Sequence, residues 1–309
     1  MNKFKKYPNL RYDKYLKYLD CVKLHNEGKI TESEMQRFLL PYENHDLRNA
    51  KEELEQICVQ RNILNFDALL KETTEYYKSI GATIEHVLVD EFQDVGTNEF
   101  SFISNLKAEN LFIVGDDWQS IYGFKGGNVS LFKTIVANGS FKVFKMGTNY
   151  RNCSQVSSVA KIVIDQVSDK LDKEVNTVSE KVGSVQFDNK SNLRLYLNKI
   201  KKEGNFKDWF VLARSNKDVF AISDVLEELN IPYVGFKRGN ISLEDMKELI
   251  KMDSIKLLTV HTSKGLESKN VLLYGNFPLR QKSFLKNTDE RKIMYVGVTR
   301  AEENLIVLN

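Results

Sequence analysis

The pattern of hydrophobic and polar positions changes character near Glu85. Before that point it is mostly helical: residues 31–34 (TESE) form a capping box that opens a helix, residues 44–61 are a charged amphipathic stretch, and a further helix begins at Asn65 and runs to about Lys78. After it, short apolar runs alternate with helix-length segments. Continuous apolar runs of this kind, separated by helices, are typical of parallel strands buried in a sheet.

The predicted strands fall into two groups, which indicate two α/β lobes in tandem. Those of the first group are 86–89, 111–114 and 141–146, and those of the second are 209–213, 232–236, 255–260, 271–274 and 305–308. Helices are predicted over 153–172, 219–229 and 289–298. The expected division is therefore a first lobe with a helical N-terminal segment (1–152), a connecting helical and polar region (153–192) and a second lobe (193–309).

Composition limits the class of protein. A chain of 309 residues with 42% hydrophobic and 28% charged residues can build two folded domains and does not read as disordered. Its net charge of +3 neither demands nor excludes a nucleic-acid partner, because a basic groove can lie on a nearly neutral protein. Three scattered cysteines do not predict a disulfide framework or a zinc site. The chain has neither an apolar run long enough for a membrane helix nor a secretory signal, so we expect a cytoplasmic protein without a membrane partner.

The strongest local feature is residues 87–94 (VLVDEFQD), an apolar strand that ends in Asp90 and Glu91. Magnesium prefers hard oxygen ligands beside a nucleotide's phosphates, and an adjacent carboxylate can orient or deprotonate an attacking water. The alternative interpretation is an ordinary surface turn with three acids.

A second feature is residues 114–127 (VGDDWQSIYGFKGG), where a predicted strand again ends in acids. The amide of Gln119 could contact a terminal phosphate. The rings of Tyr122 and Phe124 could stack on bases of a single strand without sequence preference. The alternative is a glycine-rich loop whose aromatic side chains, Trp118 included, fill a small core.

Three further polar segments are candidate sites. Tyr150 and Arg151 place an aromatic ring beside a fixed cation, which suits an adenine and a phosphate. Residues 261–267 (HTSKGLE) follow a predicted strand and could hold a sugar-phosphate backbone, and Arg300 lies near the end of a predicted helix. Each segment by itself is more often a solvated polar loop than a site.

In chain order, the segments VLVDEFQD, GDDWQSIYGFKGG, TNYR, VHTSKGLES and YVGVTRAEENL resemble the successive helicase motifs of superfamily 1, in the UvrD/Rep/PcrA group of DNA helicases. LNFDALL (64–70) is similar to the segment just upstream of that group's magnesium motif. The resemblance covers roughly residues 60–309. It implies two RecA-like parallel-sheet lobes, ATP and Mg²⁺ as cofactors, and single-stranded or partly duplex DNA as the partner.

The resemblance also implies catalytic roles. Asp90 would hold the magnesium ion, and Glu91 would act as the catalytic base. Gln119 would sense the γ-phosphate. Arg151 and Arg300 would neutralise charge in the transition state, with Arg300 in the position of an arginine finger.

Two sets of binding residues follow from the same resemblance. The nucleotide would be held by a stacking ring, a cation and a loop that lies along the triphosphate and ribose, namely Tyr150, Arg151, Gly265 and Glu267. The DNA would be held by a stacking pair and by two residues near its backbone, namely Tyr122, Phe124, His261 and Thr262.

The chain departs from the family in three ways. It contains no GxxxxGK[ST] P-loop: Gly28 and Lys29 are followed by Ile30, and Lys23 stands where the first glycine should be. Met1 is therefore expected to fall inside an incomplete first lobe. The stretch from Arg151 to His261 is too short for the large helical insertion of bigger family members, and Ser268 stands where an aromatic residue or proline is common.

Three interpretations follow. The chain is part of an ATP-dependent helicase, either a truncated product or one half of a split protein whose second chain supplies the P-loop. Alternatively, it is a degenerate helicase that serves as a DNA- or partner-binding module, or an unrelated α/β binding protein. The presence of Glu91, Gln119, Arg151 and Arg300 favours the first, because a pure binding module has no physical need for a catalytic base and phosphate-facing arginines.

Overall fold

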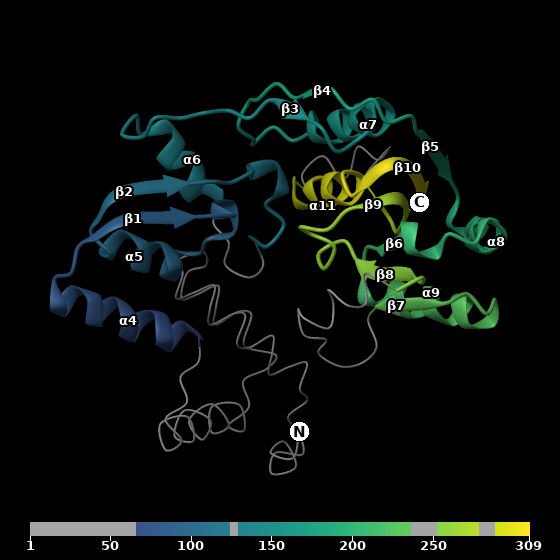
Figure 1. Cartoon of the computed structure of the whole chain (residues 1–309), viewed down its shortest axis with the longest axis horizontal. Coiled ribbons are helices and arrows are strands. Elements are labelled where there is room, and N and C mark those ends of the chain that lie inside the picture. Colours follow the sequence, from purple (N-terminus) through teal and green to yellow (C-terminus); the bar gives the residue numbers. More distant parts are fainter. Residues whose placement is uncertain (1–65, 124–128, 236–251, 278–287) are drawn as a thin grey trace, which may run out of the picture. The chain divides into compact units, whose positions relative to one another are not determined.

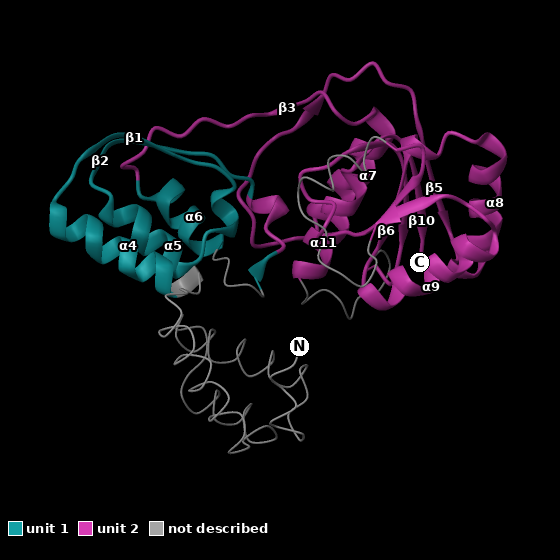
Figure 2. Ribbon diagram, turned by 60° about the horizontal axis from the view of Figure 1, so that its bottom comes forward, with its two compact units in different colours: residues 1–116, 122–138 teal, residues 117–121, 139–309 magenta. Residues whose placement is uncertain are grey.

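The computed structural model describes residues 66–123, 129–235, 252–277 and 288–309 (Figure 1). The expected capping box at 31–34 and the side chain of Phe124 lie outside these ranges. The chain forms two compact units, coloured separately in Figure 2: unit 1 is Met1–Asp116 with Tyr122–Asn138, and unit 2 is Asp117–Ile121 with Gly139–Asn309. The division expected at 152 and 193 does not coincide with these units.

Unit 1 is built on two parallel strands, β1 (Ile84–Val89) and β2 (Ala108–Ile113), as the sequence predicts. The helix α4 (Phe66–Ile80) precedes them, α5 (Thr97–Asn105) connects them, and α6 (Val129–Ala137) follows. The helices α4 and α5 pack together, with the rings of Tyr77 and Phe102 in edge-to-face contact 6.2 Å apart. A parallel pair with a helical crossover is the smallest α/β unit.

The two faces of this small sheet differ. Side chains alternate along a strand, so Val87 and Val89 share one face, where they are partly buried. Leu88 and its register partner Phe112 lie on the other face and are 74% and 59% exposed. The expectation that both faces of the sheet are buried is therefore wrong at Leu88 and Phe112, which remain largely exposed.

The prediction of a strand at 141–146 is also wrong, because these residues are irregular and Phe144 and Met146 are exposed. A strand needs a neighbour for its backbone hydrogen bonds, and no described residue pairs with this segment. The pairing begins just after it, where β3 (Thr148–Asn149) lies parallel to β4 (Asn176–Thr177).

Unit 2 contains a six-stranded sheet in the order β5-β10-β9-β6-β8-β7, and every pairing is parallel. The five strands predicted for this part of the chain are confirmed, and β5 lies in the stretch expected to be a polar connection. The strands are β5 (Ser184–Asp188), β6 (Trp209–Ala213), β7 (Tyr233–Gly235), β8 (Ile255–Thr259), β9 (Ser268–Tyr274) and β10 (Ala301–Leu308).

The described helices of unit 2 are short, and none of the three between Arg151 and His261 exceeds 13 residues. They are α7 (Ser154–Ile164), α8 (Leu193–Glu203), α9 (Asn216–Glu228) and, later in the chain, α11 (Thr288–Val298). Ser215 opens α9 through a capping box with Asp218, which satisfies backbone donors at the helix start. Helix α8 ends at Gly204, whose positive φ of 80° suits a glycine.

The architecture is thus mixed α/β with parallel sheets, as expected for RecA-like lobes. Functional side chains in such sheets collect at the carboxyl ends of the strands. No helix in the described ranges is both long and apolar enough to cross a membrane.

Candidate functional site

The acidic pair of unit 1 lies where β1 ends. Asp90 and Glu91 are both exposed, and the Asp90 Oδ1 accepts a hydrogen bond from the Glu91 backbone N–H at 2.8 Å. Glu91 has φ 51° and ψ 38°, a left-handed conformation that is uncommon for a residue other than glycine and is enriched at functional sites. This turn directs the chain into the short 3₁₀ helix η2 (Phe92–Asp94).

Gln93 connects this acidic pair to the end of β2, a role that sequence reasoning missed. Its side chain is fully buried; the Nε2 donates to Glu91 Oε2, and the Oε1 accepts the Asp116 backbone N–H at 2.8 Å. A Cβ at Gly115 would lie only 2.8 Å from the Gln93 Oε1, so glycine is needed for this close approach. The only sequence signal is the glutamine inside DEFQD. Gln93 therefore holds the Glu91 carboxylate in place.

The 3₁₀ helix η3 (Asp117–Gln119) belongs to unit 2, although its neighbours on both sides in the chain belong to unit 1. Its first two side chains are buried and both contact Leu171: the Asp117 Oδ2 accepts the Leu171 N–H at 2.7 Å, and the Trp118 Nε1 donates to the Leu171 carbonyl at 3.0 Å. The Trp118 ring also makes an edge contact with Tyr295. Trp118 is thus a core residue, as the alternative interpretation proposed for it.

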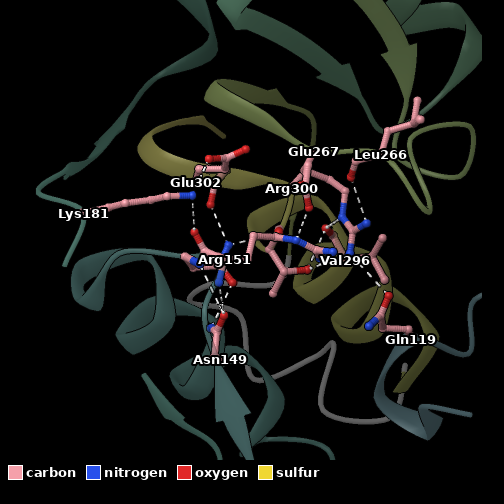
Figure 3. Close-up of polar contacts among 12 residues, drawn as sticks. Gln119, Asn149, Arg151, Lys181, Leu266, Glu267, Val296, Arg300 and Glu302 are labelled. Atoms are coloured by element: carbon pink, nitrogen blue, oxygen red, sulfur yellow. Dashed lines mark hydrogen bonds and ion pairs between the residues drawn. The ribbon is translucent and has the colours of Figure 1, made fainter. Parts of the chain in front are cut away.

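Gln119, the next residue, contacts Arg300. The Arg300 side chain is only 1% exposed, and its Nη2 donates to Gln119 Oε1 at 3.3 Å (Figure 3). Its other donors bond to Val296 O, Leu266 O and the Thr299 hydroxyl at 3.0–3.2 Å. A buried charge needs such hydrogen bonds, and here they also hold the guanidinium in one orientation.

Arg151 and Arg300 come from different segments of the chain but contact adjacent residues of the loop at 261–267. The Arg151 side chain is partly exposed and forms an ion pair with Glu267, while Arg300 bonds to the carbonyl of the adjacent Leu266 (Figure 3). The Lys181 Nζ donates to the Arg151 carbonyl and pairs with Glu302, which ties the Arg151 backbone to the residues after Arg300. The two predicted arginines are therefore brought together by their contacts with the adjacent residues Leu266 and Glu267.

The remaining predicted residues of unit 2 lie either in the loop at 261–267 or beside Arg151. Thr262 bonds to Thr259 through the two hydroxyls at 2.8 Å, and His261 is partly buried. Gly265 has φ +82°, which favours glycine at this turn. Tyr150, beside Arg151, is exposed with its ring available for stacking. In unit 1, Tyr122 is partly buried.

Asp90, at the end of β1, is the candidate ligand for a magnesium ion. In the described parts of the chain, His, Cys, Asp and Glu form no cluster of three or more that could hold a metal ion. Magnesium at phosphate sites, however, uses one or two carboxylates and takes its other ligands from phosphate and water. The exposed carboxylate of Asp90 at a strand end fits this requirement.

Two family models match this chain. The model described as the UvrD/REP helicase N-terminal domain matches residues 3–138, and the model of the UvrD-like helicase C-terminal domain matches residues 144–241 and 237–309. The first match begins well before residue 60. The similarity to helicases thus extends further toward the N-terminus than the motifs alone indicate.

Curated relatives are also DNA helicases. A probable DNA helicase of Mycoplasma pneumoniae is 28% identical over 269 residues, covering 78% of this chain and 46% of that protein. DNA helicase IV of Escherichia coli is 27% identical over 249 residues, with 72% and 34% covered. The ATP-dependent DNA helicase Rep of Buchnera aphidicola is 26% identical over 301 residues, with 89% and 45% covered. The chain spans less than half the length of each of these relatives.

The family models cover both the acidic strand end of unit 1 and the arginine cluster of unit 2, in the order in which these occur along the chain. The sheets are parallel and the predicted motifs follow their strands. The chain therefore belongs to the UvrD-like family of superfamily 1 DNA helicases.

Proposed function

We propose that this chain is the motor portion of an ATP-dependent DNA helicase, which couples ATP hydrolysis to movement along single-stranded DNA. The observation that carries the proposal is the arrangement of polar groups around Arg300. Its guanidinium contacts Gln119 and the carbonyl of Leu266, next to the Glu267 that pairs with Arg151. Two cations and a neutral amide held close together suit the γ-phosphate of a nucleotide.

In this function the residues of unit 2 bind the nucleotide. Arg151 exchanges its ion pair with Glu267 for a phosphate, which releases the Glu267 carboxylate to accept a hydrogen bond from the ribose. Tyr150 stacks on the adenine, and Gly265 lets the backbone lie along the triphosphate. Arg300 and Gln119 stabilise the charge that develops on the terminal phosphate.

In unit 1 the acidic pair takes two different roles. Asp90 would hold Mg²⁺, and the ion when bound would neutralise charge on the phosphate groups of the nucleotide. Glu91 accepts a proton from the attacking water, and its hydrogen bond from Gln93 keeps the carboxylate oriented.

The P-loop sets the condition for activity. None of the 309 residues forms the GxxxxGK[ST] pattern whose amides and lysine cradle the phosphates. Because positioning and charge neutralisation supply nearly all of the catalysis of phosphoryl transfer, residues 1–309 by themselves do not turn over ATP. A P-loop segment from the same polypeptide or from a second chain completes the enzyme.

A phosphate-release assay tests this proposal. Residues 1–309 are compared, with and without single-stranded DNA, with a fusion that carries the P-loop segment of a relative such as the Mycoplasma pneumoniae helicase ahead of Met1. The fusion hydrolyses ATP with DNA stimulation, and Glu91→Gln abolishes this turnover. Glu109→Gln, at an exposed position of β2, serves as the matched control and leaves it unchanged.

Two outcomes would contradict the proposal. If the Glu91→Gln variant of the fusion still hydrolyses ATP, Glu91 is not the catalytic base. A fusion that binds DNA but never hydrolyses ATP supports the alternative, a degenerate helicase that serves as a binding module.

The DNA contact has its own test. If Tyr122 and Phe124 stack on bases, replacing both by alanine weakens single-stranded DNA binding by about 2–4 kcal/mol, at about 1–3 kcal/mol per base. Fluorescence anisotropy with a labelled oligonucleotide measures the affinity, which should also fall with added salt. Unchanged affinity in the double variant would make these rings core residues.

A further inference from the structure

Two asparagine side chains connect the segments that carry Arg151 and Arg300. Asn152 is only 3% exposed, and its Nδ2 donates to the carbonyl of Thr299 at 3.1 Å and to that of Ala301 at 2.6 Å. These carbonyls belong to the residues on either side of Arg300. One amide thus holds the backbone of Arg300 from both sides, across 147–149 positions of sequence.

Asn149 connects the same amide to Arg151. Its Oδ1 accepts the backbone N–H of Arg151 at 3.0 Å and that of Asn152 at 3.3 Å. Its Nδ2 donates to the Asn152 Oδ1 at 3.0 Å and to the Ser157 hydroxyl, also at 3.0 Å. Figure 3 shows Asn149 directly beside Arg151. The chain of bonds therefore runs from the Arg151 backbone through two amides to the Arg300 backbone.

Each amide uses both of its N–H donors and its acceptor oxygen. A carboxamide offers two N–H donors and one acceptor oxygen, and each donor of Asn152 has its own carbonyl. Aspartate at this position would have no donor, and serine is too short to reach both carbonyls. A buried network whose members are all satisfied is rigid and sets a single geometry.

Neighbouring contacts keep the two segments in the same register. The Cys153 backbone N–H donates to the Glu302 carbonyl at 2.7 Å, and the Lys181 Nζ bonds to the Arg151 carbonyl. These contacts bring the two segments together, and Asn152 in addition bonds to the two residues that immediately flank Arg300.

We propose that Asn152 is a positioning residue, which fixes the Arg300 guanidinium relative to Arg151 so that both cations meet one triphosphate. The catalytic purpose of this alignment rests on the proposed function. The alignment itself can be measured without ATP. Enzymes are sensitive to such alignment, since a displacement of about 1 Å can lower the rate about 10²-fold.

The first experiment uses NMR on residues 1–309 to measure how well the Arg300 side chain is protected from exchange with solvent. The buried Arg300 Nε–H donates to Val296 O, so its signal, assigned by its loss in Arg300→Lys, exchanges slowly with water. In Asn152→Ser its exchange with solvent rises by about tenfold or more, because the local opening of its segment becomes easier. Asn198→Ser, at an exposed position of α8, is the matched control and leaves the signal unchanged.

An internal reference separates positioning from unfolding. The Arg214 Nε–H donates to Glu290 at 2.7 Å in the same unit, and its signal stays as in the wild type if unit 2 remains folded. If Asn152→Ser unfolds the unit, Asn149→Ser removes the supporting amide only, and it raises the exchange of Arg300 by a smaller factor. An Arg300 signal unchanged in a folded Asn152→Ser or Asn149→Ser variant would overturn the proposal.

The second experiment reads the consequence for catalysis in the P-loop fusion. Asn152→Ser lowers kcat about 10²-fold with a smaller change in KM. If Asn152 acts through Arg300, the double variant Asn152→Ser/Arg300→Lys is no slower than Arg300→Lys alone. Multiplicative losses would overturn the positioning role. If the NMR result holds but turnover does not depend on Arg300, the proposed function fails and the structural alignment remains.

Discussion

The two sheets of this protein are made from similar stretches of sequence but are buried to very different degrees. The apolar runs HVL and LFI lie in the two-stranded sheet of unit 1, and WFVLA and IKLLT form two adjacent strands of the six-stranded sheet of unit 2. Every residue of β6 and β8 is buried, whereas Leu88 and Phe112 of β1 and β2 are largely exposed.

The difference comes from the neighbours of each strand. Strand β6 is paired on both edges, with β8 and β9, and the core on one of its faces includes residues of α8 and α9. In the described ranges, β1 and β2 pair only with each other. Parallel sheets are normally covered on both faces, so we expect the sheet of unit 1, with its exposed face, to be less stable than the sheet of unit 2.

The largest expected effect is a difference in hydrogen exchange. Amides of β6 and β8 open only when unit 2 unfolds, while those of β1 and β2 have fewer buried neighbours. We expect opening free energies to differ by about 4 kcal/mol, a factor of about 10³ in protection. Exchange measured by mass spectrometry on residues 1–309 checks this, and uniform protection of both sheets would remove the contrast.

A matched pair of leucine variants sharpens the contrast at single residues. Leu212→Ala in the buried β6 is expected to cost about 2–5 kcal/mol, because it removes buried methyl groups and leaves a cavity. Leu88→Ala at the exposed face of β1 should change stability by about 0.5 kcal/mol or less.

Both tryptophans, Trp118 and Trp209, lie in unit 2, so their fluorescence in denaturant measures the loss of stability in Leu212→Ala. Hydrogen exchange of the β1 and β2 amides measures the change of stability in Leu88→Ala. Similar losses in the two variants would mean that the exposed face is covered in solution.

The exposed face should also promote self-association, since exposed apolar sheet surface pairs readily with other chains. We expect residues 1–309 to associate and the double variant Leu88→Ser/Phe112→Ser to shift toward the monomer. Burying one such side chain is worth about 1.5–3 kcal/mol, so the shift should be measurable by sedimentation velocity at micromolar concentration.

Phe220→Ser supplies the control for this experiment, since Phe220 is an exposed ring on α9 of unit 2. An unaltered association state in the double variant, or an equal shift in the control, would assign the association to another surface.

The smallest effect concerns a charge inside the well-covered sheet. Lys256 of β8 is 2% exposed, and its Nζ donates to the carbonyls of Met252 and Ser254 at 2.7 and 2.9 Å. Burial lowers the pKa of Lys256 below the ordinary lysine value of 10.5. In the interval between these two values the unfolded chain binds more protons than the folded one, so stability rises with pH.

The wild-type protein should therefore gain stability relative to Lys256→Met as the pH rises toward 10.5. The gain is about 1.4 kcal/mol for each unit by which folding lowers the Lys256 pKa. Urea unfolding followed by tryptophan fluorescence at a series of pH values measures the difference. Parallel profiles for the two proteins would mean that the Lys256 ammonium is not desolvated.

The strands of unit 2 show how much of the fold was predictable. The run at 209–213 coincides with β6, and the other predicted strands of this unit differ from the observed ones mainly at their ends. Continuous apolar runs mark strands buried on both faces, so periodicity alone was sufficient. Strand β5 was missed because its sequence, SVQFD, is not a continuous apolar run. In the described ranges it is an edge strand paired only with β10, and Ser184 and Gln186 are exposed. The run at 141–146 failed for the opposite reason, since it has strand composition but no partner.

For the site, the residue types, their order and their family could be read from the amino-acid sequence: the acids at the end of β1, the arginines at 151 and 300 and the glycine-containing loop at 261–267. Which of these residues meet depends on the folded chain. The tertiary structure places Gln119 in unit 2, buries Arg300, and brings Asn152 to the carbonyls on both sides of that arginine. A linear pattern records local periodicity, whereas these bonds join residues up to 181 positions apart and exist only once parallel strands have aligned their carboxyl ends.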